Sequence, residues 1–90
     1  MNLKMTKKAL KFVKGLDKKQ QQQVSQALIS LLVNPVPHDS ETLSGAKKGE
    51  RRADIGEYRI VYTHDTESVS IIVIGKRNGD EAYRLWKQTL

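Results

Sequence analysis

Two stretches in the first third of the chain carry apolar residues at helical spacing. Thr6 is placed to cap a first helix, whose apolar stripe recurs at i, i+3, i+4 and i+7: Ala9, Phe12, Val13 and Leu16. Asp17 and Gln20 resemble a capping box and predict the start of a second helix, which Asn34-Pro35 ends. The apolar positions of that helix are Val24, Ala27, Leu28, Leu31 and Leu32. Helices joined this closely predict an antiparallel hairpin with one shared apolar side.

The period changes to two in the second half of the chain. Residues 36–49 carry Pro, Ser and Gly without a period and predict a loop. Three segments rich in β-branched and aromatic residues then predict strands, at 51–55, 58–63 and 69–74. The last of these is apolar on both faces, which favours a central strand covered on each side.

Weaker patterns lie at the two ends of the sequence. Met1, Leu3 and Met5 alternate with polar residues and indicate a short first strand. Residues 79–88 can form a terminal helix with an apolar side made of Ala82, Leu85 and Trp86. Together the patterns predict an α+β fold, with two N-terminal helices packed on a mainly antiparallel sheet of three or four strands. At 90 residues we expect one domain, spanning 1–90.

The segment Ile55-Gly56-Glu57-Tyr58 reads as a hairpin with a two-residue turn that begins with glycine. This register places Asp54 opposite Arg59 and divides the side chains between two faces. The apolar face, expected to meet the helices, holds Ala53, Ile55, Tyr58 and Ile60. The other face, expected to be open, holds Arg52, Asp54, Arg59 and Val61. Charges on that face indicate either a binding site or an ordinary solvated surface, with Arg59 and Asp54 as a cross-strand ion pair.

Composition excludes several classes of protein. The chain has no cysteine, which removes thiol catalysis, thiolate zinc sites and disulfides, and which fits a reducing cytoplasm. No apolar run approaches the length of a membrane span, and we expect neither a signal peptide nor a membrane partner. The two histidines are far apart, and no phosphate-binding glycine loop or carboxylate cluster occurs, so we expect no metal and no cofactor.

The net charge of +6 has an uneven source. Residues 1–37 contain seven lysines and one acidic residue, whereas the basic and acidic residues of 38–90 are equal in number. A one-sided positive field favours polyanionic partners. Lysine is also the ordinary surface residue of helices, so both interpretations stay open at this point.

Several motifs together resemble the RelE/ParE superfamily of toxins. The run from Arg52 to Tyr62 reads Arg-Ala-Asp-Ile-Gly-Glu-Tyr-Arg-Ile-Val-Tyr, and the last strand ends in Gly-Lys-Arg, followed by Tyr83. The Lys-Ala-Leu-Lys opening at 8–11, the Asn34-Pro35 end of the second helix and the Leu-Ser-Gly element at 43–45 also match. The resemblance covers nearly the whole chain.

The resemblance implies a small α+β toxin held inactive by a cognate antitoxin. RelE-like members cleave mRNA in the ribosomal A site by attack of a 2′-hydroxyl on the adjacent phosphate. In that mechanism Arg59 matches an arginine that contacts the scissile phosphate. Arg77 matches one that stabilises the phosphate or protonates the leaving group, and Tyr83 matches a tyrosine that stacks on or orients a base.

The resemblance leaves the proton acceptor open. Arg52 occupies a position considered for activating the 2′-hydroxyl, but a guanidinium is a poor base. Glu50 and Asp54 are the substitutes that the sequence offers. Ribosome and RNA contacts are expected from a further set of cations: Lys7, Lys11, Lys14, Lys18 and Lys76.

Two other functions remain possible on the sequence alone. The chain is also similar to ParE-like toxins, which inhibit DNA gyrase without RNA chemistry. The third possibility is a basic binding domain without toxicity. The presence of both Arg77 and Tyr83 favours the ribonuclease branch.

Overall fold

The computed structural model describes all 90 residues of the chain. Its elements in chain order are β1 (Asn2–Met5), α1 (Lys7–Lys14), α2 (Lys18–Val33), β2 (Glu41–Thr42), β3 (Arg51–Ile55), β4 (Tyr58–His64), β5 (Ser68–Lys76), a 3₁₀ turn (Asn78–Asp80) and α3 (Glu81–Gln88). The predicted α+β class is confirmed. The last strand is longer than predicted, and the terminal helix begins two residues later, after the 3₁₀ turn.

The sheet has five strands in the order β1-β5-β4-β3-β2, which is more than the three or four predicted. β1 runs parallel to β5, and the other neighbours are antiparallel. The prediction of a loop over the whole of 36–49 was wrong in one place, since β2 pairs there with β3. A two-residue strand is too short to show an alternating pattern in the sequence.

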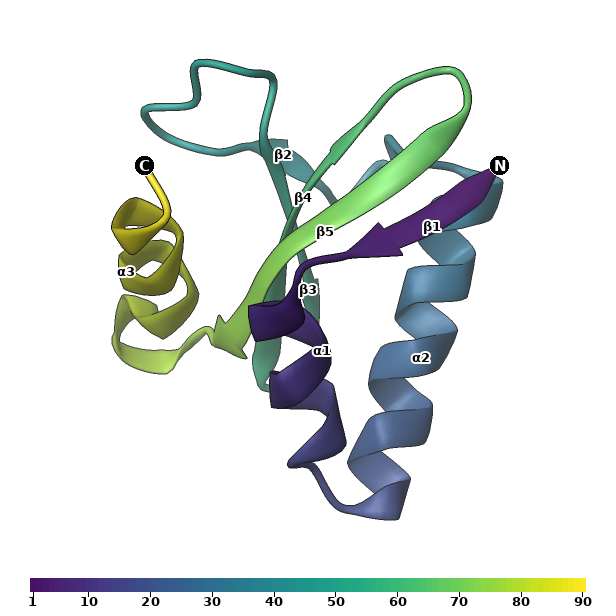
Figure 1. Cartoon of the computed structure of the whole chain (residues 1–90), viewed down its shortest axis with the longest axis vertical. Helices are drawn as coiled ribbons and strands as arrows, with labels where there is room; N and C mark the ends of the chain where they lie inside the picture. The colour runs from purple at the N-terminus through teal and green to yellow at the C-terminus, as the bar shows by residue number, and fades with distance from the viewer.

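Helices cover both faces of the sheet, as Figure 1 shows: α1 and α2 lie on one side and α3 on the other. The larger core, beneath α1 and α2, includes Ala9, Val24, Leu28, Leu31, Tyr58, Ile60, Tyr62, Val69, Ile71 and Ile74. The smaller core, beneath α3, consists of Leu43, Val61, Val73, Ala82 and Trp86. The central, covered position predicted for the last strand is therefore confirmed.

The predicted hairpin register is confirmed, with Ile55 opposite Tyr58 and Asp54 opposite Arg59. Its apolar face meets α1 and α2, as expected. The opposite face is less open than predicted, because Val61 is fully buried under α3. The charged side chains of that face, those of Arg52, Asp54 and Arg59, stay partly exposed.

Both predicted helix starts are confirmed by side-chain caps. The Thr6 hydroxyl accepts a hydrogen bond from the Ala9 amide at 3.1 Å and donates one to the Ile72 carbonyl at 2.6 Å, which fastens α1 to β5. Asp17 accepts from the Gln20 amide at 2.8 Å. The reciprocal half of the capping box is absent, because the Gln20 side chain instead donates to Glu57 of the hairpin turn.

A register shift interrupts the pairing of β4 with β5 between Val61 and Tyr62. As a result, Val69 and Ile71 belong to the larger core, whereas Val73 belongs to the smaller one. The shift changes which side chains face α3, so a simple alternation read from the sequence does not carry through β5.

The close approach of α3 to the sheet depends on Gly75 of β5. A Cβ atom at this position would lie 3.0 Å from backbone atoms of Ala82, so any side chain would push the helix outward. Gly75 is also the residue paired with Arg59. Gly75 therefore allows α3 to lie beside the charged part of the hairpin.

No helix of the chain combines the length and the apolar character needed to cross a membrane.

Candidate functional site

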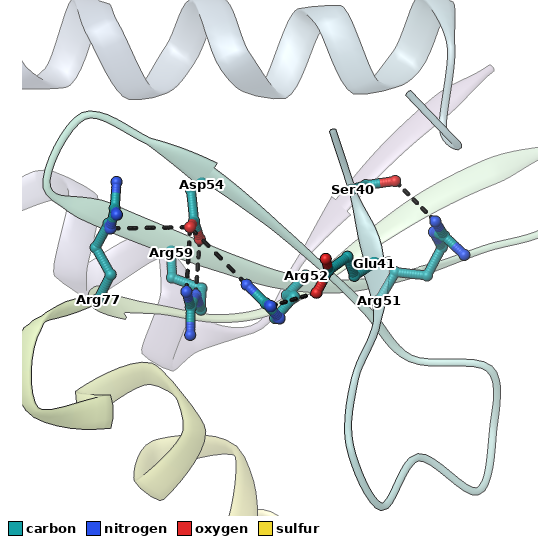
Figure 2. Close-up of polar contacts among 7 residues, drawn as sticks. All are labelled: Ser40, Glu41, Arg51, Arg52, Asp54, Arg59 and Arg77. Atoms are coloured by element: carbon teal, nitrogen blue, oxygen red, sulfur yellow. Dashed lines mark hydrogen bonds and ion pairs between the residues drawn. The ribbon is translucent and has the colours of Figure 1, made fainter. Parts of the chain in front are cut away.

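Three arginines surround the carboxylate of Asp54 on the α3 side of the sheet (Figure 2). Arg59 makes a two-point contact with it, from Nε to Oδ1 at 2.7 Å and from Nη2 to Oδ2 at 3.1 Å. Arg52 Nη1 and Arg77 Nε lie 3.9 and 3.8 Å from the same Oδ2. The hairpin turn brings Arg52, Asp54 and Arg59 to one face, and Arg77 is the residue that follows β5.

These contacts fix the charges of the cluster. The hydrogen bond from Arg59 lowers the pKa of Asp54, and the positive charges of Arg59, Arg77 and Arg52 add to this effect against the opposing influence of burial. The same hydrogen bond raises the pKa of Arg59. Asp54 is therefore ionised at neutral pH, but its lowered pKa makes it a weaker base and both of its oxygens accept hydrogen bonds from Arg59, which argues against its suggested role as the base.

The hairpin turn also holds Arg77. Its backbone amide donates to the Glu57 carbonyl at 3.0 Å, and its guanidinium Nη1 donates to the Gly56 carbonyl at 3.2 Å. About half of the Arg77 side chain is exposed, compared with 18% of the Arg59 side chain. Arg77 thus presents a tethered but accessible cation beside the more enclosed Arg59.

Two adjoining hollows connect the predicted catalytic residues. One, of about 570 Å³, is lined by Gly56, Glu57, Arg59, Arg77, Asn78 and Asp80. The other, of about 370 Å³, is lined by Leu43, Ser44, Arg52, Arg59, Asp80 and Tyr83. Arg59 and Asp80 belong to both, so they lie where the hollows meet. The structure thus brings together Arg52, Arg59, Arg77 and Tyr83.

Tyr83 projects from α3 at the edge of this site. Its ring lies 5.5 Å from the Trp86 ring, and the Lys87 ammonium lies 5.2 Å from its centroid. Its hydroxyl group is close to Gly45 in the loop that precedes β3. The ring is half-buried, so the packing role and the predicted substrate contact are both compatible with its place.

Two residues beside the site were missed by reasoning from the sequence. Glu41 of β2 forms an ion pair with Arg52. Asp80 has a left-handed backbone conformation, with φ of 56°, which is uncommon for a residue other than glycine. The pairing of β2 was not predicted, so nothing in the local pattern placed Glu41 near Arg52.

Glu50 lies away from this chemistry. It is almost fully buried, and its Oε1 accepts a hydrogen bond from the Lys48 amide at 2.7 Å. Burial would raise its pKa, but hydrogen bonds from backbone amides outweigh this and lower it. The suggestion that Glu50 acts as a base is therefore unsupported, and its contacts are those of a loop-stabilising residue.

The predicted RNA-binding lysines are divided between two places. Four of them belong to the helix layer on the opposite side of the sheet from the arginine cluster: Lys7, Lys11, Lys14 and Lys18. All four are exposed, and none forms an ion pair within the chain. Lys76 ends β5 next to Arg77.

No group of three or more histidine or acidic side chains is arranged to hold a metal ion.

The fold and these residues can be compared with known proteins. The isolated RelE toxin of E. coli is 26% identical, with a TM-score of 0.71 over 99% of this chain and 98% of that chain. The archaeal RelE–RelB complex from Pyrococcus horikoshii OT3 gives a TM-score of 0.74 at 24% identity, over 87% and 96% of the two chains. The YoeB dimer from Staphylococcus aureus gives 0.69 at 25% identity, over 81% and 92%.

Sequence comparison points to the same group. No curated protein matches closely enough to count as a relative. The sequence model of the family described as "ParE toxin of type II toxin-antitoxin system, parDE" matches residues 3–81, which is most of the chain. The chain therefore belongs to the ParE toxin family, within the RelE/ParE superfamily of type II toxin–antitoxin systems.

Proposed function

We propose that this type II toxin is a ribosome-dependent endoribonuclease that cleaves mRNA. The observation that carries the proposal is the grouping of Arg52, Arg59, Arg77 and Tyr83 around two adjoining hollows. Guanidinium groups bind two phosphate oxygens at once, and an aromatic ring can stack on a base. Together these groups suit a single nucleotide step of RNA.

In the proposed reaction the 2′-oxygen attacks the adjacent phosphorus, and the bond from phosphorus to the 5′-oxygen breaks. The products are a 2′,3′-cyclic phosphate and a 5′-hydroxyl group, so one proton leaves the 2′-hydroxyl and one reaches the 5′-oxygen. Arg59 and Arg77 stabilise the negative charge that grows on the phosphate oxygens. Arg52 adds positive charge and takes no proton, because its guanidinium stays protonated.

A direct test is cleavage of message on programmed ribosomes, followed by primer extension. We expect Arg59→Ala and Arg77→Ala each to reduce cleavage by about 100-fold or more, as removal of one transition-state donor does elsewhere. Thermal melts should change little, because neither side chain contributes to a core.

The matched control is Arg84→Ala, which removes an exposed arginine of α3 whose guanidinium has no partner within the chain. This variant should cleave like the wild type. Normal cleavage by the Arg59→Ala, Arg77→Ala double variant would show that the assigned site is wrong.

A cognate antitoxin is the expected protein partner. The E. coli and P. horikoshii RelE toxins were solved in complexes with their antitoxins. For this chain we propose a partly acidic antitoxin segment that folds on binding, since the helix layer carries unpaired lysines. Purification of the chain from its native host should bring down a small companion protein, and its absence would contradict the proposal.

Inhibition of DNA gyrase, the activity of ParE-like toxins, is the second candidate, because the matching family model describes ParE toxins. Induced expression with pulse labelling separates the two. Loss of protein synthesis before DNA synthesis supports RNA cleavage, whereas the reverse order, with inhibited supercoiling by purified gyrase, supports the ParE-like activity. No effect on either would favour a binding domain without toxicity.

A further inference from the structure

One carboxylate, that of Asp54, is shared by all three arginines of the site (Figure 2). It lies within 3.9 Å of Arg52, Arg59 and Arg77, which come from β3, β4 and the residue after β5. Three cations at such short range repel one another, and long arginine side chains lose conformational freedom when they are held in place. The arrangement therefore needs an anion at its centre.

The three arginines depend on this anion to different degrees. Arg52 has a second acidic partner in Glu41, and Arg77 has the Gly56 carbonyl. Arg59 has no other hydrogen-bond partner for its side chain. The orientation of the most enclosed of the three guanidinium groups is therefore set by Asp54.

The contact with Asp54 leaves part of the Arg59 guanidinium free. A guanidinium carries five N–H donors, and Asp54 engages Nε and one hydrogen of Nη2. Both donors of Nη1 and the second donor of Nη2 remain available, and Arg59 lines both hollows. One edge of Arg59 is thus held by the protein while the rest can bind a phosphate.

We propose that Asp54 is a positioning residue, which holds Arg59, and with it Arg52 and Arg77, in the geometry that receives the scissile phosphate. The proposal rests on the proposed ribonuclease function. Asp54 also repels that phosphate, because its own charge is negative. Removing the charge should therefore separate two effects: binding of RNA improves or stays equal, while the rate of the chemical step falls.

The experiment compares Asp54→Asn and Asp54→Ala with the wild type in single-turnover cleavage on programmed ribosomes. Affinity is measured separately with a message that carries a 2′-deoxy nucleotide at the cleavage position and cannot react. We expect the rate at saturation to fall on the order of 10- to 100-fold, as for a misplaced catalytic group. Alanine should lose more than asparagine, which keeps one oxygen for Arg59. The affinity should not weaken in either variant.

Glu67→Gln is the matched control, because it removes one exposed carboxylate from a distant turn and changes the net charge equally. Its rate and affinity should equal those of the wild type. An unchanged or faster rate in Asp54→Asn would overturn the proposal and leave Asp54 as a competing anion. Parallel loss of rate, affinity and melting temperature would overturn it in favour of a structural role.

A second measurement does not require cleavage. In NMR spectra of the free protein, the Arg59 Nε–H should give a distinct, slowly exchanging signal in the wild type, and this signal should be lost in Asp54→Ala, which removes the acceptor oxygen. Persistence of the signal would overturn the positioning role. A wild type that cleaves nothing would overturn the proposed ribonuclease function instead, and the NMR comparison would still decide whether Asp54 holds Arg59.

Discussion

At the scale of single residues, the Arg59–Asp54 ion pair contributes little to the stability of the fold, but it orients the Arg59 guanidinium. Both side chains are partly exposed, at 18% and 29%. Ion pairs near the surface contribute about 0–1 kcal/mol to stability. The sequence alone indicated this pair. Its consequence for the site is that the guanidinium donors of Arg59 not used by Asp54 are available in the two hollows.

The lowered pKa of Asp54 predicts a specific loss of stability in acid. The stabilisation that ionised Asp54 contributes is fully present above about pH 3.8, the ordinary pKa of an aspartate. It is lost as the pH falls below that value toward the lower pKa of Asp54 in the folded protein. Denaturant titrations of the wild type and Asp54→Asn should therefore show the larger difference in stability at pH 6, and this difference should shrink as the pH falls below about 3.8. A difference that is constant over this range would contradict the assigned ion pair. Asp65 and Glu50 also have lowered pKa values, but they are common to both proteins.

Tyr83 is expected to act through its ring. Tyr83→Phe should cleave within about threefold of the wild type, whereas Tyr83→Ala should lose about 5- to 150-fold, the equivalent of one base-stacking contact of about 1–3 kcal/mol. The assay is the same primer extension on programmed ribosomes. Equal losses in the two variants would assign the role to the hydroxyl group.

Because Tyr83 also packs against Trp86, the Tyr83 variants need a stability control. Thermal melts should show that Tyr83→Ala is still folded at the assay temperature. Lys87→Ala removes the cation over the ring and leaves the ring in place, so its cleavage should stay close to that of the wild type.

At the scale of elements, the hairpin turn between β3 and β4 organises the site. It fixes the register of Asp54 against Arg59, and its Gly56 and Glu57 carbonyls accept both hydrogen bonds that tether Arg77. Gly56 has φ of +58°, a conformation that other residues rarely adopt. A side chain at position 56 should therefore strain the turn and disturb the positions of both Arg59 and Arg77.

We expect Gly56→Ala to destabilise the protein by about 1–2 kcal/mol, because the backbone is left-handed there. The new Cβ would also come within 2.6 Å of the Gln23 side chain, which can move aside. Chemical denaturation measures the change. Gly15→Ala is the control, since Gly15 has φ of −82° and room for a methyl group, and it should be neutral or slightly stabilising. Equal effects of the two would refute the importance of the turn.

At the scale of the whole molecule, positive charge occurs in two layers with different surroundings. The lysines of α1 and α2 have no acidic partners, whereas the arginines on the other side of the sheet surround a carboxylate. The first arrangement suits long-range attraction of a polyanion, and the second suits contact with one phosphate.

Reversal of Lys7, Lys11 and Lys18 to glutamate should weaken ribosome binding and flatten its dependence on salt. The physical reason is the loss of a field that reaches about 8 Å at physiological salt. Binding is measured by sedimentation with ribosomes over a salt series. The control reverses Lys47, Lys48 and Arg84, which are exposed and give the same change of net charge. The same slope in both variants would mean that position is irrelevant and only net charge matters.

Much of the fold follows from local pattern. The helix caps, the apolar stripes, the strand segments and the hairpin register were all predicted, because each depends on residues within a few positions of one another. The face that carries Arg52, Asp54 and Arg59 follows from the same two-residue turn. The proximity of Arg77 and Tyr83 to this face was expected from family resemblance and not from periodicity.

Tertiary structure decided the remainder. The strand β2, and with it the Glu41–Arg52 contact, depends on pairing across eight loop residues that show no alternation. The register shift between β4 and β5 and the close packing of α3 against Gly75 determine which part of the sheet face that carries Arg52, Asp54 and Arg59 is covered. The sequence by itself thus determined which side chains share a strand face, because that depends on backbone periodicity. Only packing decided that Arg77 shares a carboxylate with Arg59, because that contact joins strands whose approach depends on the whole sheet.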